Sequence, residues 1–383
     1  MSKLDALLRT YTERPRGITG IGVTVVTKDG PIYTGVSGVT SLDPEKARPI
    51  APDTVYWLAS QTKLMTAIAA MQCVERGQIS LDDPIGSVLP ELADPDILEG
   101  FDDNGLPKLR KAKNKITLRT LMAHTSGLTY GFGHPDLIKW NAHIGQKRDI
   151  STGHISNYIE PLVFEPGSGW AYGSGLDWVG QAIERLNACS LEEYMQKNIW
   201  APLGMTSTTF RLESRPDLMS RKIEITNRNP EGDLVSIPQP FDSPAAHDLG
   251  GIGAYSTLED YGKLLQALLN DGAGILKPES VDEMFKPQLD ETLGDMHHLL
   301  YPEIPADIKL NFGLSVSIRM APMEGKRDLG CVSWGGYPHL VWWIDRKRGL
   351  ASTIFRQTLP REDPIITEMD DKIETAVYEL AEE

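Results

Sequence analysis

The sequence predicts an α+β fold in which both ends of the chain build one antiparallel sheet with helices on it. Alternating, β-branched segments occur near the N-terminus and again in the C-terminal third, and helical periodicity dominates between them. We therefore expect a discontinuous α/β domain (residues 1–79 and 201–383) and a mostly helical domain (residues 80–200). A ligand site is expected in the cleft between them.

The N-terminal elements follow from local patterns. Residues 1–9 are amphipathic and predict a short helix. Residues 21–27 and 31–39 alternate and are rich in Val, Ile, Thr and Tyr, and Lys28-Asp29-Gly30 between them is a turn signal. This pattern predicts a hairpin.

The remaining elements are predicted in the same way, from periodicity and from capping residues such as Ser190 with Glu193 three positions later. Helices are expected over residues 116–122, 176–186, 190–199 and 363–382, and strands over residues 312–320, 329–334, 339–345 and 350–357. Trp342 and Trp343 are neighbours on a strand, so at most one can face a site.

Ser60-Gln61-Thr62-Lys63 opens a long helix that ends near Gly77. Positions i and i+3 share one helix face, so the Lys63 amine lies within reach of the Ser60 hydroxyl. The apolar stripe that follows indicates a buried helix, and burial disfavours a charged amine, which makes Lys63 a candidate base. Taken alone, the pattern also fits a surface serine that caps a helix beside a solvated lysine.

Two further segments supply what acyl transfer needs beyond a nucleophile. Tyr172 precedes a helix and can project into a cleft, although a core tyrosine would give the same local sequence. Gly335 and Gly336 at the edge of a strand permit close approach of a substrate to the backbone, although a plain β-turn would also contain them.

Composition excludes several classes of function. The chain has 383 residues and a net charge of −15, which disfavours nucleic acid and anionic membranes as partners. Its three cysteines form no C-x-x-C pair and suit free thiols in a reducing compartment, so we expect a cytoplasmic protein. No metal-binding motif, dinucleotide-binding motif or apolar run of membrane-spanning length occurs, and we expect no metal and no cofactor.

In this order, the motifs resemble the serine β-lactamase-like superfamily, in particular class C β-lactamases, family VIII carboxylesterases and fungal statin side-chain acyltransferases and hydrolases. Ser60-x-x-Lys63 is similar to the first family motif, and Tyr172-Gly173-Ser174 is similar to Tyr-x-Asn. Trp334-Gly335-Gly336 stands where β-lactamases carry Lys-Thr-Gly, and residues 124–128 (HTSGL) resemble a recurrent family segment. The resemblance covers nearly the whole chain and implies a β-lactamase/transpeptidase-like fold.

The resemblance implies that Ser60 attacks an ester or thioester and becomes acylated, with proton transfer shared by Lys63 and Tyr172. The backbone N–H groups of Ser60 and Tyr337 would then form the oxyanion hole. Trp334 replaces a cation that binds the carboxylate of a β-lactam, so a neutral, apolar ester fits better than an anionic lactam. The expected substrate-binding residues are Trp334, Gly335, Gly336, Tyr130, Phe132, Trp140 and Ser174.

The expected function is hydrolysis of a bulky, apolar ester, a class that includes natural-product esters. The expected partner is a small-molecule ester or acyl donor. An acyltransferase that takes its acyl group from an ester, a thioester or an acyl carrier is the alternative, because both enzymes need the same residues. A β-lactamase or a non-catalytic binding protein of the same fold is the second alternative.

Overall fold

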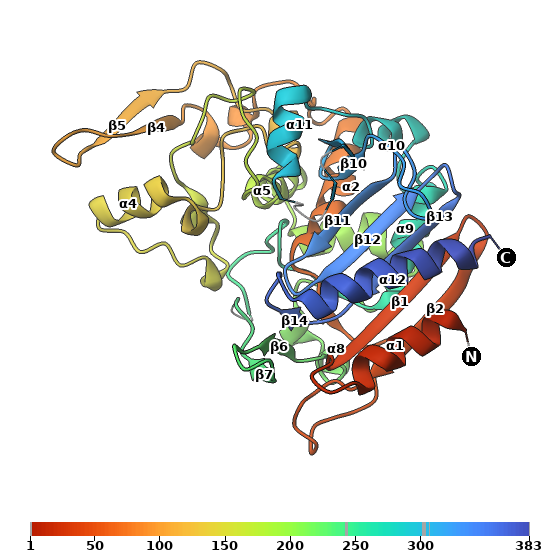
Figure 1. Ribbon diagram of the computed structural model, residues 1–383. Coiled ribbons are helices and arrows are strands. Elements are labelled where there is room, and N and C mark those ends of the chain that lie inside the picture. The colour runs from red at the N-terminus through yellow and green to blue at the C-terminus, as the bar shows by residue number, and fades with distance from the viewer. Residues whose placement is uncertain (1, 242–243, 301–303, 306, 383) are drawn as a thin grey trace.

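The computed structural model describes residues 2–241, 244–300, 304–305 and 307–382 and centres on one seven-stranded antiparallel sheet (Figure 1). Both ends of the chain contribute to this sheet, because β1 pairs with β13 as well as with β2. In order across the sheet, the strands are β2 (Gly30–Gly38), β1 (Gly20–Thr27), β13 (Leu350–Phe355), β12 (Leu340–Asp345), β11 (Val332–Gly336), β10 (Ser317–Arg319) and β9 (Leu310–Phe312).

The sheet is buried on both faces. On one face Val23 and Trp343 pack with α1 (Lys3–Glu13) and α12 (Pro364–Leu380), the two helices seen in front of the sheet in Figure 1. On the other face Trp342 belongs to a larger core with α2 (Thr62–Glu75) and α9 (Leu258–Leu269). Trp342 and Trp343 therefore lie on opposite faces, as the alternation of a strand requires.

The remaining elements include α5 (Gly175–Asn187), which contributes Trp178 to the larger core, and many shorter helices and strands. The helices are α3 (Leu118–Met122), α4 (Pro135–His143), α5 (Gly175–Asn187), α6 (Leu191–Met195), α7 (Ala201–Leu203), α8 (Pro216–Met219), α10 (Pro278–Met284) and α11 (Glu291–His298). The strands are β3 (Tyr56–Trp57), β4 (Asp96–Phe101), β5 (Pro107–Lys111), β6 (Ile225–Arg228), β7 (Leu234–Ile237), β8 (Tyr255–Ser256) and β14 (Thr358–Leu359).

Two segments differ from the sequence-based expectation. The prediction of one strand over residues 312–320 was wrong, because Ser315 adopts a left-handed φ of 71° and the chain folds back so that Ser317 pairs with Phe312. Between residues 80 and 200, the predominantly helical pattern is interrupted by the β4–β5 hairpin. The Asp102 carboxylate accepts the N–H groups of Asn104 and Leu106 in the turn of that hairpin.

The helices of the middle segment share the sheet's core: Trp178 of α5 and Trp342 of β12 belong to the same apolar cluster. The domain division at residues 79/80 and 200/201 stays a prediction. Within the described part of the chain, no helix has both the length and the apolar character that crossing a membrane requires.

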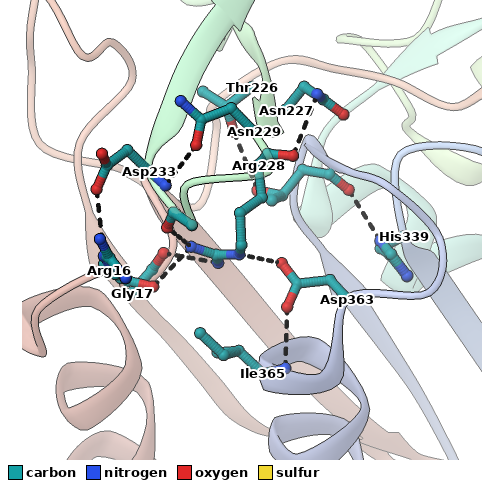
Figure 2. Close-up of polar contacts among 12 residues, drawn as sticks. Arg16, Gly17, Thr226, Asn227, Arg228, Asn229, Asp233, His339, Asp363 and Ile365 are labelled. Carbon is teal, nitrogen blue, oxygen red and sulfur yellow. Dashed lines mark hydrogen bonds and ion pairs between the residues drawn. The ribbon is translucent and has the colours of Figure 1, made fainter.

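An arginine ties the β6–β7 hairpin to both ends of the chain (Figure 2). The Arg228 Nε donates to the Asp363 carboxylate at 2.7 Å, and its terminal nitrogens donate to the carbonyls of Arg16 and Gly17 at 2.8 and 3.1 Å. Asp363 also caps α12 by accepting the N–H of Ile365. Both charged groups are largely buried and hydrogen-bonded, so this ion pair holds the β6–β7 hairpin in place against residues 16–17 and the start of α12.

Candidate active site

Ser60 lies in a single 3₁₀ turn (Ala59–Gln61) directly before α2. Ala59 has a left-handed φ of 45°, which costs a non-glycine residue about 1–3 kcal/mol. Ala59 and Gln61 are buried, whereas Ser60 is partly exposed. The strained turn therefore leaves the Ser60 side chain partly exposed between two buried neighbours.

Lys63 is almost fully buried, with 1% of its surface exposed. Its Nζ lies 3.4 Å from the Ser60 Oγ and donates to the Gly251 carbonyl at 2.8 Å. The predicted one-turn spacing thus brings the amine and the hydroxyl together.

Tyr172 reaches the same hydroxyl from a distant part of the sequence. Its Oη donates to the Ser60 Oγ at 2.6 Å, and the Lys63 Nζ lies 4.8 Å from the centre of its ring. The backbone on both sides is held, because the Ala171 N–H donates to the His124 carbonyl and the Thr129 hydroxyl donates to the Tyr172 carbonyl. Ser60, Lys63 and Tyr172 therefore form one hydrogen-bonded group.

The structure adds a buried carboxylate to this group that the sequence reasoning missed. The Lys63 Nζ donates to the Tyr130 Oη at 3.1 Å, and the Tyr130 hydroxyl donates to the Asp177 Oδ2 at 3.4 Å. The Asp177 Oδ1 accepts the Gly251 N–H at 2.9 Å. Burial raises the pKa of Asp177 to about 6, and the charge of Lys63 opposes this rise.

A signal for Asp177 was present in the sequence. It is an acidic residue in the first turn of α5 between Leu176 and Trp178, both of which are fully buried. An isolated acid among core positions of a helix needs a buried partner. Tyr130 was predicted only as part of the lining, and burial together with the charge of Asp177 raises the pKa of its phenol.

The end of β11 lies against the turn that carries Ser60. The ring of Trp334 packs 5.2 Å from the ring of Tyr172, and Gly336 closely approaches the Leu58 carbonyl at the start of the Ser60 turn. Gly335 lies between them on the same strand. The Tyr337 side chain is half exposed directly after β11. The role of its backbone N–H in an oxyanion hole stays a prediction.

The other expected substrate-binding residues occupy different positions. Phe132 stacks on Tyr130 with 5.6 Å between ring centres and is largely exposed. Ser174 directly precedes α5 and is fully buried, and its hydroxyl makes no capping hydrogen bond to the helix. Trp140 lies on α4, where the Arg148 guanidinium covers its ring.

Among the described residues, no group of three His, Cys, Asp or Glu side chains converges as a metal ion would require. The Ser60 hydroxyl, the Lys63 amine and the Tyr172 phenol lie together as reactive groups. Together they can remove a proton from Ser60 and return it to a leaving group.

Comparison with known proteins agrees with this geometry. A family model described as Beta-lactamase matches residues 4–371. The chain belongs to the Beta-lactamase family. This membership confirms the resemblance and the fold class predicted from the sequence.

Monacolin J acid methylbutanoyltransferase of Aspergillus terreus is a relative that is 37% identical to this chain over 362 residues. The aligned region covers 90% of this chain and 88% of the relative. Lovastatin esterase of Penicillium rubens is 32% identical over 361 residues, 91% and 90% of the two chains. Unliganded simvastatin synthase from Aspergillus terreus superimposes with a TM-score of 0.89 at 36% identity, covering 98% of this chain and 97% of the other. The protein is thus an enzyme of the serine acyltransferase and hydrolase class.

Proposed function

We propose that this protein transfers an acyl group from an activated donor to the hydroxyl of a bulky, apolar natural product. The observation that carries the proposal is the pair of contacts on one oxygen: the Ser60 Oγ lies 2.6 Å from the Tyr172 phenol and 3.4 Å from the Lys63 amine. A hydroxyl with two proton-handling groups at hydrogen-bond distance is arranged as an activated nucleophile.

In the proposed reaction, Ser60 attacks the donor carbonyl while its proton passes to the pair formed by Lys63 and Tyr172. The backbone N–H groups of Ser60 and Tyr337 stabilise the oxyanion. Collapse of the tetrahedral intermediate expels the donor's alcohol or thiol, which takes up the proton, and leaves the acyl group on Ser60. In the second half of the reaction, the acceptor hydroxyl gives its proton to the same pair and attacks the acyl carbonyl. The bond to the Ser60 Oγ then breaks, and Ser60 takes the proton back from the pair.

The lining favours a neutral substrate. Tyr130 contacts Lys63 and Trp334 packs on Tyr172, so aromatic rings lie beside both proton-handling groups. Trp334 stands where a β-lactamase carries a lysine. Without that lysine, an anionic lactam loses a charge-assisted hydrogen bond of about 1.5–3 kcal/mol. The transferase relative acts, by its name, on monacolin J acid, which supports a bulky secondary-metabolite acceptor.

The proposed donor is an ester or a thioester, and the thioester donors include an acyl group on an acyl carrier. We place the reaction in the cytoplasm, since Cys73 and Cys331 are buried free thiols that suit a reducing compartment.

Hydrolysis is the second candidate, because one relative is named lovastatin esterase. It needs the same acyl-enzyme and differs only in the final acceptor, which is water instead of an alcohol. The two reactions are thus separated by how the acyl group on Ser60 partitions between the two acceptors.

The test combines labelling and product analysis. A fluorophosphonate probe should label the wild-type protein at Ser60, and Ser60→Ala should abolish both labelling and turnover of a p-nitrophenyl ester. The exposed Ser214, changed to alanine, serves as the control and should leave both unchanged. With a bulky alcohol present, ester product in excess of free acid supports transfer, free acid alone supports hydrolysis, and full turnover by Ser60→Ala contradicts the proposal.

A further inference from the structure

A closed ring of hydrogen bonds lies behind Ser60, on the buried side of Lys63. It runs from the Lys63 Nζ to the Tyr130 Oη at 3.1 Å and from the Tyr130 hydroxyl to the Asp177 Oδ2 at 3.4 Å. It continues from the Gly251 N–H to the Asp177 Oδ1 at 2.9 Å and closes from the Lys63 Nζ to the Gly251 carbonyl at 2.8 Å. Asp177 is the only carboxylate of this ring, and its side chain is fully buried.

The ring is built by segments that are fixed independently. Thr66 of α2 donates its hydroxyl to the Gly250 carbonyl at 2.7 Å, which holds the turn before Gly251 on the same helix as Lys63. Gly251 has no room for a side chain, because a Cβ there would stand 2.5 Å from the Asp177 Oδ2. Asp177 therefore packs directly against the Gly251 backbone.

The contacts of the Lys63 amine suit an ammonium group. The amine has three acceptors within 3.4 Å, namely the Ser60 Oγ, the Tyr130 Oη and the Gly251 carbonyl, which match the three protons of an ammonium group. The Tyr130 oxygen accepts a hydrogen bond from the Lys63 Nζ, and the Tyr130 hydroxyl donates a hydrogen bond to Asp177. A carboxylate at the end of this path stabilises positive charge at Lys63.

We propose that Asp177 is a positioning residue for the reaction. It holds Tyr130 and Gly251 on Lys63, and its negative charge sets the pH at which the Lys63–Tyr172 pair becomes able to accept the Ser60 proton. The proposal rests on the acyl-enzyme mechanism through Ser60 and adds to it a residue that does not touch the substrate.

The direction of the effect does not depend on which member of the pair is the base. Lys63 or Tyr172 must be unprotonated before Ser60 can attack, and a nearby negative charge opposes the loss of that proton. Removing the charge makes this loss easier. The titratable groups that face Asp177 or Lys63 from the surrounding elements are Tyr130, Tyr158, Tyr172 and His124.

The experiment measures kcat/KM for a p-nitrophenyl ester against pH with the wild-type protein and Asp177→Asn. Asparagine keeps the shape and the acceptor for the Gly251 N–H but loses the charge. We expect the ascending limb of the profile to move to lower pH by about one unit or more, with a lower kcat on the plateau and little change in KM.

Asp260→Asn is the matched control. Asp260 is a buried aspartate in the first turn of α9, it accepts the Ser207 N–H, and it pairs with Lys263. This variant should alter stability and leave the ascending limb in place. If Asp177→Asn does not fold, Tyr130→Phe breaks the same path and should shift the limb in the same direction by a smaller amount.

The outcomes are distinguishable. An Asp177→Asn profile that superimposes on the wild-type profile, or moves to higher pH, overturns the role of Asp177 while acylation of Ser60 stands. Wild-type protein that never becomes acylated on Ser60 overturns the proposed function and this inference together.

Discussion

Gly336 and Leu58 are in direct backbone contact: a Cβ atom on Gly336 would stand 2.4 Å from the Leu58 carbonyl oxygen. No side chain fits at that distance, so the end of β11 can lie against the turn that carries Ser60 only because residue 336 is glycine. The position of the sheet edge relative to the nucleophile is therefore set by two backbone segments and not by flexible side chains.

Gly336→Ala should consequently lower activity far more than it lowers substrate binding. The added methyl group pushes the end of β11 away from the Ser60 turn and moves the proposed oxyanion donor at Tyr337. A displacement near 1 Å in such a site costs about 100-fold in rate, and we expect kcat to fall by about 10- to 100-fold. The measurement is the kcat for a p-nitrophenyl ester.

Gly133→Ala is the control for this change. Gly133 does not have a left-handed φ, and a Cβ there would meet no atom within 4 Å. Its kcat and melting temperature should match those of the wild-type protein. Unchanged kcat in Gly336→Ala would show that the contact with Leu58 does not position the site.

Tyr172→Phe removes the hydroxyl that lies 2.6 Å from the Ser60 Oγ and keeps the ring that packs on Trp334. The fold should survive, and kcat should fall by about 10²- to 10⁴-fold, the usual contribution of a positioned proton-transfer group. Single-turnover kinetics should assign the loss to acylation. Tyr56→Phe, which removes a buried hydroxyl beside Phe355, should leave the acylation rate unchanged.

The sequence predicted the parts of the site that depend on local geometry. Ser60 and Lys63 are three residues apart where the 3₁₀ turn runs into α2, so their contact is local, and Tyr172 followed from its resemblance to a family motif. Asp177 and Gly251 meet across 74 residues, and no periodicity specifies such a pairing. Their contact depends on how α5 and the Gly250–Gly251 turn pack on α2, which only the structure gives.

The fold shows the same division between local and long-range causes. The β1–β2 hairpin follows from alternation and from the turn at Gly30, and the paired ends of the chain follow from strands at both termini. The break between β9 and β10 was missed because residues 310–319 alternate as one strand would. A left-handed Ser315, whose N–H donates to the Met122 carbonyl, turns the chain there.

His297 should make the protein sensitive to acid. Burial beside Trp170 and Phe312 lowers the pKa of His297 to about 3, well below its usual value. In the unfolded chain the imidazole takes up a proton near pH 6.5, but in the folded protein it does so only near pH 3. The stability that the neutral ring contributes is therefore complete above pH 6.5 and is lost as the pH falls.

Urea unfolding between pH 7 and 5 measures this loss. His297→Gln should lose about 2 kcal/mol less than the wild-type protein between pH 7 and 5, because glutamine does not titrate. His143→Gln, at an exposed position, should follow the wild-type curve. Parallel curves for His297→Gln and the wild-type protein would contradict the assignment.

Asp177→Asn should raise the stability of the protein at neutral pH while it lowers the activity. Burial raises the pKa of Asp177 to about 6, so the folded protein favours the protonated carboxyl group more than the unfolded chain does. The contribution of this group to stability is complete below about pH 4 and is lost as the pH rises through 6. At pH 8 the buried charge costs about 3 kcal/mol that the amide of asparagine does not.

Asparagine gives up the acceptor for the Tyr130 hydroxyl, which costs about 1 kcal/mol, so the net gain should be about 1–2 kcal/mol at pH 8 and should vanish near pH 4. Urea unfolding of both proteins at these two pH values measures the difference. A difference that is the same at both pH values would mean that Asp177 is not a buried charge in the folded protein. A gain that grows with pH, together with a loss of kcat, would show that the carboxylate is kept at the expense of stability because Lys63 needs it.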